Sequence, residues 1–131
     1  LHKVKIDLRS CQVDLDATPP LIEDALFHCQ QAVEKSYKAY LLWQDQPFRK
    51  THDLAELGGW CVKLMPSWDK LLKKANEMTI FATLYRYPSV SKIDKPPSLA
   101  QTKKYMVLAR KIAGMVVAQL PQAVQDKIKF D

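Results

Sequence analysis

Apolar residues recur at intervals of three and four along most of the chain, which is the spacing of one face of an α-helix. Strand signals are nearly absent, and proline- or glycine-containing segments separate the periodic stretches. The helices expected from this pattern span residues 3–16, about 20–46, about 52–65, 67–86 and 98–120, with a short sixth over 122–129. The sequence therefore predicts an all-α fold, an antiparallel up-and-down bundle of about five helices.

The length of the chain predicts a single domain over residues 1–131, large enough to bury a core without disulfides. Its three cysteines are odd in number and far apart, so we expect no disulfide framework, no structural zinc and no cofactor. Cys11 and Cys29 are interpreted as small buried hydrophobes. No apolar run approaches the roughly 20 residues of a membrane span, and the first residues lack a signal-peptide pattern, so a cytoplasmic location is expected.

Positive charge is unevenly distributed along the chain. Residues 1–61 carry seven Lys or Arg and nine Asp or Glu, whereas residues 62–131 carry 13 and five, for a net charge of +6 overall. This asymmetry is typical of a surface that attracts nucleotides, RNA or an acidic partner. It is equally compatible with lysine-rich helix faces that only keep the bundle in solution.

The expected second helix carries an apolar and a polar stripe. The apolar stripe, assigned to the core, consists of Ile22, Leu26, Cys29, Val33, Tyr37, Tyr40 and Leu41. The polar stripe runs from His28 through Gln31 to Lys35 and Lys38. Its two lysines are included in a predicted anion-binding site, because a basic turn follows where the helix stops.

That basic turn contributes Arg49, Lys50 and His52. If the next helix begins with a free N-terminus, its N–H groups and these side chains can hold a phosphate, and the imidazole can act as acid or base on a ribose 2′-hydroxyl. Alternatively, Thr51 and Asp53 cap that helix and His52 hydrogen-bonds to a neighbouring helix. Both interpretations are compatible with the sequence.

Arg86 and Tyr87 stand at the end of the expected fourth helix and complete the predicted nucleotide- or anion-binding set. A guanidinium suits phosphate, and a phenol ring can stack on a base or donate a hydrogen bond. Alternatively, Arg86 binds the terminal carbonyls of its own helix while Tyr87 packs on Pro88.

The carboxylates form no catalytic set. Glu23 and Asp24 fall in the first turn of a helix, where the dipole favours acids, and Glu34 is placed to pair with Lys38 four residues later. The sequence contains no P-loop, dinucleotide fingerprint or nucleophile elbow. These residues therefore identify no particular reaction.

Roughly residues 5–120 resemble the HEPN family (higher eukaryotes and prokaryotes nucleotide-binding domain). The matching residues are FHCQQAVEK (residues 27–35), Lys38-Ala39, THDL (residues 51–54), Leu57 and the Arg-Tyr-Pro run at 86–88. The resemblance implies a nucleotide- or partner-binding helical module, a homodimer, and the companion of a minimal nucleotidyltransferase in a toxin–antitoxin-like pair.

The same resemblance provides an alternative function. Ribonuclease members of the family carry an Arg followed, after about four to six residues, by a His. Here only two residues separate Arg49 from His52, which departs from that pattern. A metal-independent ribonuclease acting on RNA, with His52 as the acid–base group and Arg49 on the phosphate, is therefore the second hypothesis.

Overall fold

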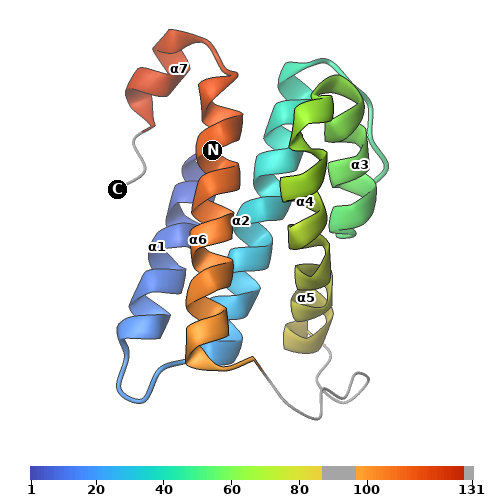
Figure 1. The fold of residues 1–131 in the computed structure, drawn as a ribbon. Coiled ribbons are helices and arrows are strands. Elements are labelled where there is room, and N and C mark those ends of the chain that lie inside the picture. The colour runs from blue at the N-terminus through green and yellow to red at the C-terminus, as the bar shows by residue number, and fades with distance from the viewer. Residues whose placement is uncertain (87–96, 129–131) are drawn as a thin grey trace.

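The structure, a computed structural model, describes residues 1–86 and 97–128, with the backbone alone for residues 83–86. Every regular element in these ranges is helical, which confirms the all-α prediction. The elements are α1 (His2–Asp16), α2 (Ile22–Trp43), α3 (Leu54–Leu64), η1 (Pro66–Trp68), α4 (Asp69–Ala75), η2 (Asn76–Met78), α5 (Thr79–Arg86), α6 (Leu99–Ala118) and α7 (Gln122–Lys127). They form a helical bundle (Figure 1).

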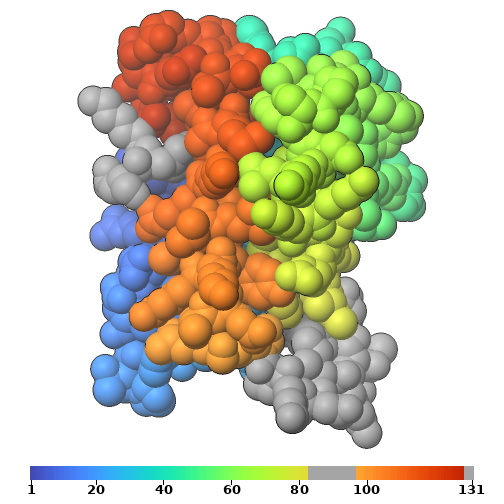
Figure 2. Space-filling view, viewed as in Figure 1, coloured from blue at the N-terminus to red at the C-terminus, as the bar shows by residue number. Residues whose placement is uncertain are grey.

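Helix α2 is the central element of the bundle, because α1, α3, α5 and α6 all pack against it. Its predicted core stripe is buried at Leu26, Cys29, Val33, Tyr37, Tyr40 and Leu41, while Ile22 is half-buried. The space-filling view shows α6 along the middle of one face, between α1 and α4 (Figure 2). None of the described helices is both long and apolar enough to cross a membrane.

The bundle is antiparallel only in part. Helix α1 runs against α2, but α3 and α6 run in the same direction as α2 (Figure 1). The direction of α3 follows from residues 44–53, which return along α2: His52 contacts Glu34, and Gly58 further along α3 lies against Tyr37. A strictly up-and-down arrangement would have required a short turn at this point.

Two helix ends differ from the expected bounds for local reasons. Helix α2 ends at Trp43 and not near residue 46, because Asp45 adopts φ 53° and the Gln46 N–H donates back to the carbonyl of Leu41. The stretch expected as one helix over 67–86 begins with the 3₁₀ turn η1 and is divided into α4 and α5 by the 3₁₀ turn η2. The first of these turns places Trp68 on the ring of Tyr40, with centroids 4.9 Å apart.

The start of α6 agrees with the prediction. Ser98 is its N-cap, and a capping box joins the side chains and backbone N–H groups of Ser98 and Gln101. This local hydrogen-bonding pattern fixes the residue at which α6 begins.

Candidate anion-binding site around His52

A buried carboxylate on α2 gathers donors from its own helix and from the following loop. Glu34 Oε1 accepts from Gln30 Nε2 at 3.0 Å and from His52 Nδ1 at 2.9 Å, and its Oε2 accepts from Lys38 Nζ at 3.1 Å. The Glu34 side chain is only 4% exposed. We call Gln30, Glu34, Lys38 and His52 the Glu34 cluster.

The helical repeat explains three of the four members of this cluster. Residues 30, 34 and 38 lie in one row along α2, so the pairing of Glu34 with Lys38 that the sequence predicted is confirmed. His52 joins from the loop, whose backbone is tied to the same row because Gln30 Nε2 also donates to the carbonyl of His52 at 3.4 Å. Gln31 completes the arrangement by donating to Gln30 Oε1 at 2.7 Å.

The environment of Glu34 keeps it ionised. Burial alone would raise the pKa of this carboxyl, but hydrogen bonds from Gln30, His52 and Lys38, together with the positive charge of Lys38, outweigh it. The net result is a pKa below the ordinary value for a glutamate. An ionised carboxylate only accepts hydrogen bonds, so Nδ1 of His52 carries a proton.

His52 therefore has a fixed inner edge and an open outer edge. Its side chain is 55% exposed although Nδ1 is engaged by Glu34. Nε2 is consequently the ring atom that is available to a ligand. Such a carboxylate-oriented imidazole suits either phosphate binding or proton transfer.

The first turn of α3 is already satisfied by protein groups. Asp53, and not Thr51, is the N-cap: its Oδ1 accepts from the Ala55 N–H at 3.0 Å. The Leu54 N–H donates to Thr79 Oγ1 at 3.0 Å, and Thr51 Oγ1 accepts from the Asp53 N–H. The free helix N-terminus that the first interpretation of the basic turn required is therefore absent at residues 53–55.

The cations of the predicted site are only partly brought together. Lys38 and His52 meet at Glu34, whereas Lys35 points to α1 and binds Asp7 Oδ2 at 2.7 Å. Arg49 makes a two-pronged, exposed ion pair with Glu56, and the hydrogen bond from its guanidinium lowers the pKa of that carboxyl.

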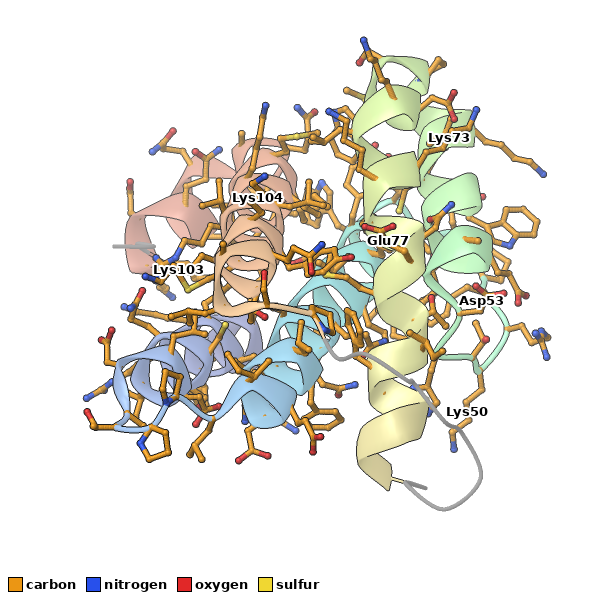
Figure 3. All side chains as sticks on the ribbon, turned by 60° about the horizontal axis from the view of Figure 1, so that its bottom comes forward. Lys50, Asp53, Lys73, Glu77, Lys103 and Lys104 are labelled. Atoms are coloured by element: carbon orange, nitrogen blue, oxygen red, sulfur yellow. The ribbon has the colours of Figure 1, made fainter. Side chains whose placement is uncertain are left out.

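The remaining predicted positions lie on or beyond the edges of this site. Lys50 is exposed on the loop that precedes α3 (Figure 3). Arg86 is the last residue of α5 by its backbone, while its side chain and Tyr87 fall outside the described residues. The anion-binding assignment of these residues therefore stays a prediction.

A second polar cluster lies on the α1 side of α2. Asp7 accepts from His28 Nδ1 at 3.0 Å as well as from Lys35, and His28 Nε2 lies 4.0 Å from Asp14 Oδ2. Burial raises the pKa of Asp14, although the charge of His28 opposes the effect. We call Asp7, Asp14, His28 and Lys35 the Asp7 cluster. Acidic side chains thus neutralise the cations of the polar stripe of α2. Lys35 is half-buried and links α2 to α1 through Asp7, so it is not a freely solvated cation.

The sequence contained one signal for this clamp that the stripe analysis missed. Asp7 lies next to Leu8 and between Val4 and Cys11, on the face of α1 that the structure buries. A carboxylate among buried positions needs a cationic partner on the helix that it faces. The polar stripe of α2 provides that partner in Lys35.

A separate small groove of about 100 Å³ lies between α3 and α4. It is lined by Gly58, Gly59, Asp69, Lys73 and neighbouring residues, and by none of the predicted site residues. Among the described side chains, no group of three His, Cys, Asp or Glu is arranged to hold a metal ion. The Glu34 cluster is therefore the better candidate site.

Fold and site together define a helical bundle that presents polar clusters on its central helix. Residues 2–120 match the family described as HEPN domain, so the chain belongs to this family. It is thereby a nucleotide- or RNA-related helical module. No curated protein and no solved structure matches the chain.

Proposed function

We propose that this protein is a binding module that holds the phosphate groups of a nucleotide or of RNA at the outer edge of His52. The observation that carries the proposal is the half-exposed imidazole whose Nδ1 is fixed by the buried carboxylate of Glu34. A ring that is already oriented loses little conformational entropy when a ligand binds to Nε2. With Nδ1 donating to Glu34, Nε2 donates to a phosphate oxygen in the doubly protonated ring, and that hydrogen bond is then charge-assisted.

The surrounding cations support an anion at this position. Lys50 is exposed on the same loop, and Lys38 lies at the opposite oxygen of Glu34. Arg49 is engaged by Glu56, but an exposed ion pair is weak enough to be exchanged for a phosphate. In the proposal, Lys38, Lys50, Arg49 and His52 hold the ligand, while Lys35 serves the Asp7 cluster.

Binding of ATP or RNA should depend more on the side chains of the basic turn than on the net charge of the protein. We expect His52→Ala and Lys50→Ala each to weaken binding of ATP or of a labelled single-stranded RNA about five- to tenfold. The matched control is Lys111→Ala, which removes one exposed charge from α6 and should change affinity less than about twofold. Fluorescence anisotropy and calorimetry at fixed salt measure these affinities.

Two outcomes would contradict this proposal. If the wild-type protein binds neither ATP nor RNA, the site has no phosphate function. If Lys111→Ala weakens binding as much as His52→Ala, the basic C-terminal half acts as a general electrostatic surface. Lys103 and Lys104 project from α6, whereas Lys50 lies beside the start of α3 (Figure 3), so the two surfaces are separable by mutation.

The proposal also includes the protein's binding partners. The family resemblance favours a homodimer and a minimal nucleotidyltransferase as companion in a toxin–antitoxin-like pair. Co-purification with a nucleotidyltransferase encoded beside its own gene tests the companion, and light scattering on a sizing column tests the homodimer. A monomer that does not retain such a nucleotidyltransferase would remove this part while leaving phosphate binding intact.

The Glu34–His52 pair also favours a second candidate function. A carboxylate that fixes the imidazole is the arrangement that general acid–base catalysis requires, so His52 can serve a metal-independent ribonuclease with Arg49 on the phosphate. The basic residues 62–131 would then hold the RNA electrostatically. Total RNA incubated with wild-type protein and EDTA should be degraded, and His52→Ala should leave it intact. Equal RNA integrity with both proteins would eliminate this candidate.

A further inference from the structure

Two cysteines from neighbouring helices meet in the core of the bundle. Cys11 of α1 and Cys29 of α2 are completely buried, and their Sγ atoms lie 3.1 Å apart. Both are free thiols, as is Cys61, which instead points its Sγ at the carbonyl of Tyr37. The proposed function uses none of the three.

The two sulfur atoms are close enough for a covalent bond with little rearrangement. A disulfide holds its sulfurs about 2.0 Å apart, so the observed pair needs to approach by only about 1 Å. Helices α1 and α2 are joined by a short connection and pack along their lengths. A bond between positions 11 and 29 would therefore tie α1 to α2 without changing the course of the chain.

We propose that Cys11 and Cys29 form an oxidisable pair that closes an intramolecular disulfide when a small-molecule disulfide such as oxidised glutathione is available. One cysteine, as thiolate, attacks a sulfur of the oxidant, which forms a mixed disulfide and releases one reduced thiol. The other cysteine loses its proton and attacks the protein sulfur, which releases the second reduced thiol. The protein pair loses two electrons and two protons, and the oxidant is reduced to two thiols.

Burial determines when this reaction can occur. The hydrogen bond with Cys11 and burial both raise the pKa of the Cys29 thiol, so Cys29 stays protonated while α1 is docked, and the buried pair is closed to an oxidant. The oxidant gains access when α1 lifts from α2. The expected behaviour is slow oxidation of the native protein, and faster oxidation in urea at a concentration that loosens α1 without unfolding the rest.

Intact-mass spectrometry and peptide mapping test the proposal on the wild-type chain. After incubation with excess oxidised glutathione in mild urea, we expect a monomer that has lost two hydrogen atoms and a Cys11–Cys29 cross-linked peptide. The melting temperature of this form should exceed that of the reduced form by on the order of 5 °C. Reduction with excess dithiothreitol should restore the original mass and melting temperature.

Variants separate the pair from the third cysteine. Cys61→Ser should still form the cross-link, whereas Cys11→Ser and Cys29→Ser should not. Because a serine in the core can destabilise the fold, Cys11→Ala and Cys29→Ala provide the same test with circular dichroism as the folding check. Any of three results with the wild-type chain would overturn the proposal. The chain could lose no hydrogen atoms in the presence of the oxidant, it could stop at the mixed disulfide, or it could form its cross-link through Cys61.

Discussion

Glu34→Gln is expected to lower the free energy of unfolding at pH 7 by about 2 kcal/mol, because it removes the buried negative charge that three donors share and exchanges one of its two acceptor oxygens for an NH₂ group. The replacement amide has the size of the carboxylate but carries no charge, and its NH₂ group would face other donors. This loss of stability is smaller than the loss expected when a fully buried charge is left without a partner. The side chains of His52 and Lys38 are partly exposed, so they can form hydrogen bonds with water in the variant. Urea denaturation followed by circular dichroism measures the change.

The pH dependence of this effect has a definite sign. The pKa of Glu34 is lowered in the folded protein relative to its ordinary value of 4.5. The carboxylate therefore contributes its full stability above the unfolded-state pKa and loses it as the pH falls through the lower, folded-state pKa. The difference between wild type and Glu34→Gln should be present above pH 4.5 and shrink as the pH falls below that value.

Glu56→Gln is the matched control, since it also removes a glutamate that binds a cation. The Glu56–Arg49 pair is exposed, with 70% of the Arg49 side chain open to solvent, and should contribute little to stability. Equal losses from the two variants, or a Glu34→Gln effect that grows at acid pH, would show that the buried network does not stabilise the fold as argued.

Much of the fold was readable from local patterns. The apolar stripe of α2 predicted Leu26, Val33 and Tyr37 as core residues, and each is buried because one face of a helix must pack on its neighbours. Ser98 was predicted to open α6, and a capping box depends only on residues three apart. The HEPN resemblance agrees with the match over residues 2–120.

The direction of α3 was not predictable in this way. Whether residues 44–53 turn sharply or return along α2 depends on distant contacts, chiefly those of His52 with Glu34 and Gln30. The interruption of α4 at Asn76 likewise reflects packing against other helices more than local propensity. Helical periodicity identifies which face of each helix is buried, but it does not specify the direction in which the next helix runs.

The cations of the candidate site and the local pairing of Glu34 with Lys38 were predictable, whereas the contacts between distant acids and cations were not. Lysine at position 35 and histidine at 52 are visible in the sequence, but their carboxylate partners lie 28 and 18 residues away. Without those partners the stripe of α2 resembles an open cationic surface. With them, the proposed site is limited to Lys38, the outer edge of His52, and Arg49 and Lys50 on the exposed loop.

Asp7→Asn is expected to lower the free energy of unfolding by about 2–3 kcal/mol, because the buried carboxylate of Asp7 holds both Lys35 and His28. It is the main ionic link between α1 and α2, so the loss should fall first on the docking of α1. Amide hydrogen exchange should show α1 losing protection before the centre of α2 does. Uniform loss of protection across all helices would contradict a local clamp.

A double-mutant cycle separates the interaction free energy of the Asp7–Lys35 ion pair from the other effects of the two substitutions. Lys35→Met removes the cation while keeping the aliphatic stem, so Asp7→Asn combined with Lys35→Met leaves neither charge without its partner. The double variant should be more stable than the sum of the single losses predicts, with a coupling of about 1 kcal/mol or more. Additive losses would mean that Asp7 and Lys35 act independently. In that case His28, and not Lys35, would be the partner through which Asp7 fastens α1.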